Sequence, residues 1–240
     1  MNQTIIEIAH TVSAIPGVKR LLKPFYYPLK RVSSKRQNKR FIKNSLLVLE
    51  AFDKCMCSNG INYTLVFGSL LGAIREGGFI KHDMDIDVSV PVEDRKKSCE
   101  SLLSAGFKMV RRYRIDDGEL GCEETFVYKN TQVTIDVFYV CPPIDKLPYC
   151  CCWNLCGNSA TARESMKKHG KVIPRRIELP FSYETKRIVF ESIEVNIDIN
   201  ADQISRYCYG PDYMIPNPNY IVPVEHRVVW SEKSAIYEEF

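Results

Sequence analysis

The sequence predicts an α+β fold in which a mixed β-sheet is flanked by helices and followed by a loop-rich carboxy-terminal part. Two observations lead to this prediction. Apolar residues recur at helical spacing in some segments and alternate with polar residues in others, and Gly, Asn and Pro separate these segments. The 240 residues are 45% hydrophobic and 26% charged, which is typical of globular proteins and excludes the disordered and fibrous classes.

The individual elements follow from these patterns. A first helix is expected over residues 37–58, because Ile42, Leu46 and Leu49 recur at helical spacing and Asn59-Gly60 ends it. Short apolar runs rich in β-branched and aromatic residues predict strands. The expected strands are 61–67, 85–90, 107–115, 125–129 and 133–140, with helices at 70–76 and 92–105. Beyond residue 141 we expect an irregular connection, helices at 159–169 and 202–207, a hairpin at 186–195 and a proline-rich tail.

Charge is distributed unevenly along the chain. Residues 1–43 hold ten of the 33 Lys and Arg but only one of the 29 acidic residues. A basic arm over residues 1–40 is therefore expected, and Pro16, Pro24 and Pro28 argue against one long helix there. The arm is either solvated or in peripheral contact with an anionic membrane surface, and no nucleic acid is expected as a partner. The sequence has no signal for secretion and no apolar run of spanning length, which indicates a cytoplasmic protein.

Ten cysteines are many for this length. Without an export signal, disulfides are not the expected state. Four of the cysteines lie between Cys150 and Cys156, but three adjacent thiols point in different directions and do not suit one tetrahedral ion. The sequence therefore favours small buried thiols over structural zinc and leaves the role of this cluster open.

The most informative segment contains three aspartates. Side chains alternate across a strand, so Asp85 and Asp87 project from the same face, roughly 7 Å apart. Asp83 shares this parity and joins them if the strand begins early. Carboxylates crowded on one face repel each other unless a cation lies between them, and Mg²⁺ prefers oxygen ligands. The pattern predicts a site for Mg²⁺, with Mn²⁺ as the alternative; the opposing interpretation is a solvated acidic loop.

A later strand offers the third carboxylate. Asp136 is the only acidic residue among the apolar residues of 133–140, where an unpaired acid is costly. If the two strands are neighbours, Asp136 lies beside Asp85 and Asp87. Three carboxylates so placed hold two metal ions in phosphoryl-transfer sites.

Gly68 and Ser69 are predicted to form a phosphate-binding turn between a strand and a helix. Glycine lets the backbone approach a phosphate, the helix amino terminus presents free N–H groups, and serine adds a hydroxyl donor. Arg75 supplies a planar fork of donors. Its alternative role is to pair with groups near Glu76. His82 either contacts substrate or packs.

These residues resemble the LicD family, which includes the fukutin-related proteins. The resemblance is carried by residues 68–75 (GSLLGAIR), 78–80 (GFI), 82–88 (HDMDIDV) and 209–216 (YGPDYMIP). Two departures are Lys81-His82, where the family often has Pro-Trp, and Met84, where it often has Asp. The resemblance implies a nucleotidyltransferase-like catalytic core over 41–145 and a substrate-side subdomain over 146–240.

The resemblance also implies an activity. LicD-type enzymes transfer a phospho-alcohol such as phosphocholine from a CDP-activated donor to a sugar hydroxyl of a cell-surface glycan or its precursor. In this chain Asp85, Asp87 and Asp136 would bind metal and act in catalysis, and Gly68, Ser69 and Arg75 would bind the donor phosphates. Two alternatives stay open: a nucleotidyltransferase acting on a small molecule or protein, and an inactive glycan-binding protein.

Overall fold

The computed structural model describes residues 18–217 and 227–240 of the chain, and side chains over 36–217 and 228–240. The first residues of the predicted basic arm and part of the predicted proline-rich tail lie outside the described residues.

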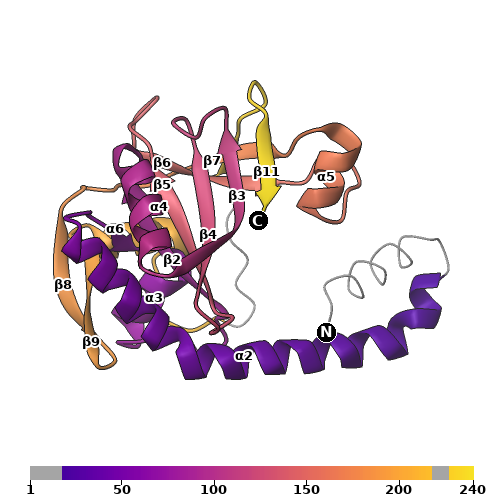
Figure 1. Ribbon diagram of the computed structural model, residues 1–240, viewed down its shortest axis with the longest axis horizontal. Helices are drawn as coiled ribbons and strands as arrows, with labels where there is room; N and C mark the ends of the chain where they lie inside the picture. The colour runs from indigo at the N-terminus through magenta and orange to yellow at the C-terminus, as the bar shows by residue number, and fades with distance from the viewer. Residues whose placement is uncertain (1–17, 218–226) are drawn as a thin grey trace.

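The centre of the fold is a six-stranded sheet with the order β1-β2-β5-β4-β3-β11 (Figure 1). β2 and β5 run parallel, whereas every other neighbouring pair is antiparallel. The predicted α+β class with a mixed sheet is thereby confirmed. The strands are β1 (Thr64–Leu65), β2 (Asp85–Pro91), β3 (Phe107–Ile115), β4 (Cys122–Tyr128), β5 (Thr134–Val140) and β11 (Ala235–Glu239).

Helices lie on both faces of this sheet. α2 (Val18–Ser58) and α4 (Arg95–Ser104), which follows the short 3-10 helix η1 (Val92–Asp94), contact each other and β2. Ile86, Val88 and Ile135 point toward this side and are fully buried, as their alternation predicts. α3 (Phe67–Arg75) lies at the β2 edge of the other face, where α6 (Ala201–Tyr209) packs against it. The alternating residues Asp85, Asp87 and Asp136 therefore lie on the opposite face of β2 and β5, away from α2 and α4.

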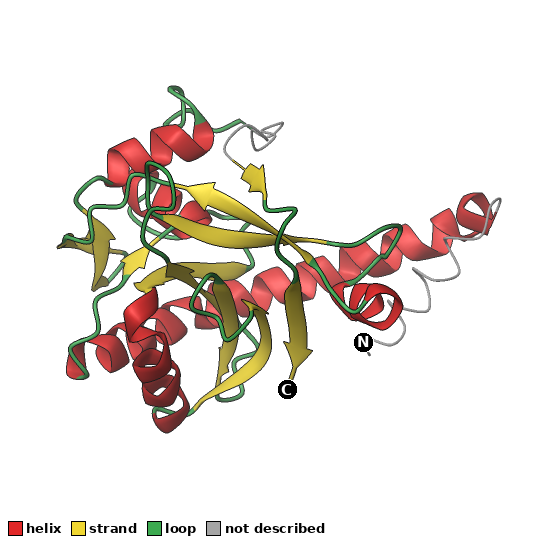
Figure 2. Ribbon diagram, turned by 90° about the horizontal axis from the view of Figure 1, so that it is seen from above, coloured by secondary structure: helices red, strands yellow, loops and turns green. Residues whose placement is uncertain are grey.

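Two smaller sheets complete the fold (Figure 2). One has the order β10-β7-β6 and consists of β6 (Tyr149–Asn154), β7 (Ile173–Glu178) and β10 (Arg227–Val229). The other pairs β8 (Thr185–Phe190) with β9 (Ile193–Asp198), beside β1. α5 (Ala162–His169) packs against β11, with Thr161 as its N-cap.

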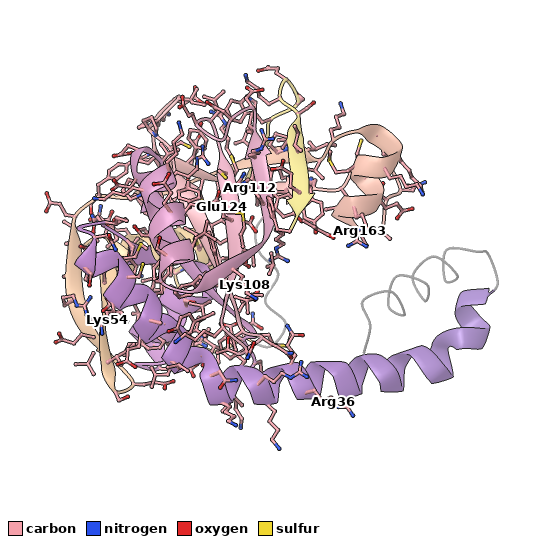
Figure 3. All side chains as sticks on the ribbon, in the orientation of Figure 1. Arg36, Lys54, Lys108, Arg112, Glu124 and Arg163 are labelled. Atoms are coloured by element: carbon pink, nitrogen blue, oxygen red, sulfur yellow. The ribbon has the colours of Figure 1, made fainter. Side chains whose placement is uncertain are left out.

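The first helix differs from its prediction at one end only. It ends at Ser58, as expected, but begins at Val18 and therefore passes through Pro24 and Pro28. The expectation that the prolines exclude one long helix was wrong, because each proline removes one hydrogen bond and bends a helix without having to end it. Figures 1 and 2 show α2 extending past the sheet, and Arg36 lies on this extending part (Figure 3). Among the described residues, no helix is both long and apolar enough to cross a bilayer.

Two segments beyond residue 141 also differ from their predictions. Cys150, Cys151 and Cys152 lie in the regular strand β6 rather than in an irregular connection. Cys150 and Cys151 are fully buried, as small apolar thiols would be. Near the end of the chain, where no strand was expected, β11 pairs with β3 and forms the edge of the central sheet.

A buried ion network supports the helix-covered face. Glu124 on β4 is fully buried and accepts hydrogen bonds from Arg112 Nε at 2.9 Å and from Tyr139 Oη at 2.7 Å. Arg95 lies 3.7 Å from the same carboxylate. Figure 3 shows Arg112 and Glu124 side by side on the sheet. Because the charges are compensated, Glu124 is tolerated in this core.

Candidate functional site

The carboxylates meet where β2 and β5 run side by side. In this parallel register Asp85 lies opposite Thr134, and Asp87 lies opposite Asp136. Neighbouring strands are about 4.8 Å apart, so these side chains share one polar patch on the face away from α2 and α4. The condition that the two strands be neighbours is therefore met. Asp83 precedes the strand, which begins at Asp85, and lies in the loop before it.

Gly68 and Ser69 lie inside the first turn of α3, which begins at Phe67. The prediction of a separate turn after a long strand was wrong, because β1 is only two residues long and the helix follows it at once. Ser69 Oγ accepts a hydrogen bond from the backbone N–H of Asp87 at 2.9 Å. The start of α3 is thus tied directly to the strand that carries the carboxylates.

The loop containing Asp83 lies close to this helix start. A Cβ atom on Gly68 would lie 2.8 Å from Asp83 Oδ2, so only glycine permits this approach. The preceding Phe67 has a φ of 46°, a strained value for a bulky residue. Its ring packs edge-on against Phe138 of β5 at 5.0 Å. Packing on the sheet therefore holds the strained backbone at the entrance to α3.

Arg75, the predicted phosphate-binding arginine, pairs with its neighbour. Its Nη2 and Nε donate to Glu76 Oε1 at 2.7 and 3.2 Å, and its side chain is 12% exposed. This is the alternative contact that the sequence left open. Phosphate binding by Arg75 stays a prediction.

Asp136 is held by two side chains that the sequence analysis did not single out. Arg111 Nη2 donates to both of its carboxylate oxygens at 3.1 Å, and Thr125 Oγ1 donates to Oδ1 at 2.5 Å. Arg111 Nε also donates to Thr125 Oγ1 at 2.7 Å. Asp136 is buried, so this arginine compensates a charge that would otherwise be costly.

Glu123 is a further buried carboxylate on the same face. Glu123 lies two residues before Thr125 on β4, so strand alternation places both side chains on one face, and Glu123 Oε2 accepts a hydrogen bond from Trp153 Nε1 at 2.7 Å. The Trp153 ring stacks against Tyr113 of β3 at 5.4 Å. Alternation alone could have placed Arg111, Tyr113, Glu123 and Thr125 in two same-face pairs. The short turn segments between the three expected strands are typical of consecutive hairpins, so the sequence did hold a signal for placing these pairs beside Asp136.

Burial and mutual repulsion raise the pKa values of several of these carboxyl groups. Burial, followed by Asp85 and Asp136, raises the pKa of Asp87 well above its ordinary value. Burial and Asp136 likewise raise the pKa of Asp85. Glu123 has its pKa raised to about 8 by burial and Asp136, against the opposing effect of Arg111. With all of its carboxyl groups ionised, the cluster would carry more negative charge than Arg111 compensates, so a further cation would stabilise the ionised form.

Because Asp83 lies among these carboxyl groups, its titration should make the stability of the fold depend on pH. Burial, then Asp85 and Glu76, raise its pKa to about 6, whereas an unfolded aspartate titrates near about 3.9. The folded state therefore binds this proton more tightly, and the Asp83 contribution to stability falls as pH rises between about 4 and 6. We expect Asp83→Asn to raise the free energy of unfolding more at pH 7.5 than at pH 4.5, measured by urea titration in EDTA. Asp117→Asn, at an exposed position, is the control. An equal gain at both pH values would contradict the assignment.

The donor set suits a hard divalent cation. Asp85 and Asp87 provide only oxygen ligands, and Mg²⁺ is typically held by one or two carboxylates together with substrate phosphates. Within the described part of the chain, no group of three or more His, Cys, Asp or Glu side chains is arranged to hold a metal ion by itself. The geometry therefore fits a metal completed by a substrate better than a preformed protein cage.

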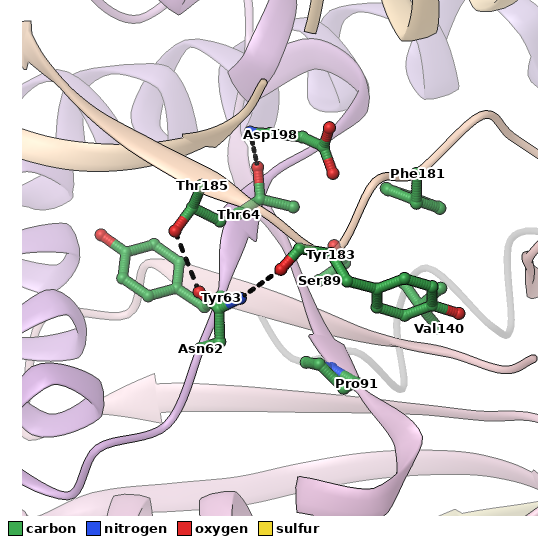
Figure 4. Close-up of a pocket in the computed structure, with 10 residues that line it drawn as sticks. All are labelled: Asn62, Tyr63, Thr64, Ser89, Pro91, Val140, Phe181, Tyr183, Thr185 and Asp198. Carbon is green, nitrogen blue, oxygen red and sulfur yellow. Dashed lines mark hydrogen bonds between the residues drawn. The ribbon is translucent and has the colours of Figure 1, made fainter. Parts of the chain in front are cut away.

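A small cavity lies at the other end of β2 (Figure 4). It encloses about 20 Å³, enough for one water molecule. Its buried Asp198 accepts hydrogen bonds from the backbone N–H of Ser182 at 3.0 Å and from Ser182 Oγ at 2.7 Å. This satisfied carboxylate supports the fold next to β1, and the cavity is too small for a substrate.

Comparison with known protein families finds a match. Residues 60–145 match the family described as "LicD/FKTN/FKRP, nucleotidyltransferase domain". The matched stretch runs from just before β1 to just after β5 and therefore includes Asp85, Asp87 and Asp136. The resemblance seen in the sequence is thereby confirmed for these residues. No curated protein matches the chain.

Proposed function

We propose, from the premise that residues 60–145 form a LicD-family nucleotidyltransferase domain, that this protein is a metal-dependent phosphotransferase. Its donor is a CDP-activated alcohol of the CDP-choline type, and its acceptor is a sugar hydroxyl of a cell-surface glycan or its precursor. The family supports a glycan-modifying transferase in general. The donor and the acceptor are the parts that we propose.

One observation carries the proposal. The parallel register of β2 and β5 sets Asp87 opposite Asp136, and the N–H of Asp87 donates to Ser69 at the start of α3. Acidic side chains and a helix amino terminus are thus fixed next to each other by the strand pairing and by the hydrogen bond to the Ser69 hydroxyl. A diphosphate needs both, because the helix end favours anions and a carboxylate-bound cation offsets phosphate charge.

We assign metal binding, phosphate positioning and proton transfer to different residues of the site. Asp85 and Asp87 would hold Mg²⁺ or Mn²⁺, with Asp136 as the third predicted ligand. The metal, when bound, offsets negative charge on the diphosphate. Gly68 and Ser69 position the start of α3 toward the phosphates. Asp136, fixed by Arg111 and Thr125, is the group best placed to orient the acceptor hydroxyl and take its proton.

The proposed reaction is an in-line displacement at the phosphorus that carries the alcohol. The acceptor oxygen forms a new O–P bond, and the bond from that phosphorus to the bridging oxygen of the diphosphate breaks. The leaving group is CMP, which keeps the bridging oxygen. The hydroxyl proton goes to the base, and no oxidant or reductant is needed.

A second candidate is transfer of the nucleotide itself. The matched family is described as a nucleotidyltransferase domain, and the same acidic strand and helix would serve attack at the other phosphorus. The acceptor would then gain a nucleoside monophosphate, and the phospho-alcohol would leave. The two reactions give products of different mass.

Product analysis tests both candidates. The purified chain is incubated with Mg²⁺, a panel of CDP-alcohols and candidate glycans, and CMP release and acceptor mass are recorded. We expect glycan-dependent CMP release and an acceptor heavier by one phospho-alcohol. An acceptor heavier by one CMP unit would favour the second candidate. No turnover with any pair, together with no Mg²⁺-dependent binding of a CDP-alcohol in calorimetry, would refute both.

A further inference from the structure

Arg111 is the cation nearest to the carboxylate cluster, and only part of its guanidinium is used inside the protein. Nη2 donates to Asp136 and Nε donates to Thr125. Among the described residues, nothing accepts a hydrogen bond from Nη1. The Arg111 side chain is 38% exposed, whereas that of Arg75 is 12% exposed and donates to Glu76. Arg111 is therefore the more accessible of the two arginines.

The contacts to Asp136 and Thr125 orient this free edge. A guanidinium is planar and rigid, so two hydrogen bonds along one side fix the direction of the remaining N–H groups. Arg111 projects from the same face as Thr125, its partner across β3 and β4, and Thr125 in turn lies opposite Asp136. A ligand on the carboxylate patch would thus meet an arginine that is already ordered.

A phosphate ligand needs such a group here. Asp85, Asp87, Asp136 and Glu123 surround the patch, and each repels an anion in its charged form. Charge-assisted hydrogen bonds from arginine to phosphate oxygens are among the strong ones in proteins. A metal ion on Asp85 and Asp87 and the free edge of Arg111 would offset this repulsion from two sides.

We propose that Arg111 binds the phosphate oxygens of the diphosphate donor through its Nη1 edge while its Nη2 and Nε hold Asp136 and Thr125. This inference rests on the proposed function, because it names the residue that takes the donor's phosphates in that site. It also assigns one side chain to two tasks, orienting a predicted base and binding the group on which that base acts.

The test separates this role from that of a structural counter-ion. Asp136→Asn removes the carboxylate but leaves Arg111, and the double variant Arg111→Gln/Asp136→Asn removes both members of the pair, so neither leaves the Asp136 carboxylate without its partner. Inorganic pyrophosphate is titrated into each by calorimetry at fixed Mg²⁺. We expect the double variant to bind about tenfold more weakly than Asp136→Asn. Arg114→Gln is the matched control, since Arg114 lies on β3 but pairs with Glu238 at the sheet edge.

The possible outcomes are distinct. If Arg111 only compensates Asp136, the two variants bind pyrophosphate equally, and the inference is overturned. No pyrophosphate binding by the unmodified protein also overturns it. Failure of the proposed function has another signature: CDP-alcohols would then give no CMP release, whereas the difference in pyrophosphate affinity between the two variants would persist.

Discussion

Asp87→Asn is expected to lower kcat/KM for CMP release about 100-fold or more. Asp87 lies at the centre of the site, opposite Asp136 and bonded through its N–H to Ser69. An asparagine keeps the shape and the backbone contact but removes the charge that would attract the metal. Steady-state kinetics at saturating Mg²⁺, with Asp117→Asn as the exposed control, measure this effect. Retained turnover would refute the assignment of Asp87 as a metal ligand.

The same substitution should change stability in the opposite direction. Burial and repulsion from Asp85 and Asp136 raise the pKa of Asp87, so the folded state holds its proton more tightly than the unfolded state. Its contribution to stability therefore falls as pH rises from the ordinary aspartate range toward the raised pKa. We expect Asp87→Asn to melt at a higher temperature than the unmodified protein at pH 7.5 in EDTA. A variant that is both inactive and less stable would indicate a folding defect instead.

Gly72→Ala is expected to destabilise the protein by about 3 kcal/mol. A Cβ atom at Gly72 would lie 2.4 Å from the carbonyl oxygen of Gly78 and 3.2 Å from the backbone N of Ile80. Because both atoms belong to the backbone, the loop from α3 toward β2 would have to move. Urea unfolding of the purified variant measures the change.

Gly68→Ala is the matched control for this prediction. Gly68 also lies in α3, but its added Cβ would meet the carboxylate of Asp83, a side chain that can rotate away. We therefore expect Gly68→Ala to cost less stability than Gly72→Ala. Because alanine is the better helix former and restricts the unfolded chain, an equal loss in both variants would indicate that the contact with Gly78 is not the cause of the cost at Gly72.

Part of this architecture follows directly from local sequence. Strict alternation of Asp85 and Asp87 with Ile86 and Val88 is enough to predict β2 and the direction in which its carboxylates point. β5 was predictable for the same reason. β1 was predicted too long, because the apolar residues before Thr64 pack in the core outside the ladder and Val66, which still donates its N–H to the Asp87 carbonyl at 3.1 Å, leads directly into α3.

The remaining parts depend on contacts between distant segments. Asp136 lies beside Asp85 and Asp87 only because β5 pairs with β2, with β3 and β4 between them in the sequence, an order that no local pattern encodes. The cysteine-rich strand β6 was missed because thiols give no strand signal, although they fill a buried strand well. The metal, the donor and the role of each carboxylate stay predictions until they are measured.

The position of β11 has a practical consequence for anyone producing this protein. Residues 235–239 cover the outer edge of β3, the strand that carries Arg111, and they are made long after β3 itself. Until the ribosome has released them, that edge presents unpaired backbone groups on which another nascent chain can add a strand. Substitutions that weaken the pairing of residues 235–239 with β3 should therefore promote aggregation.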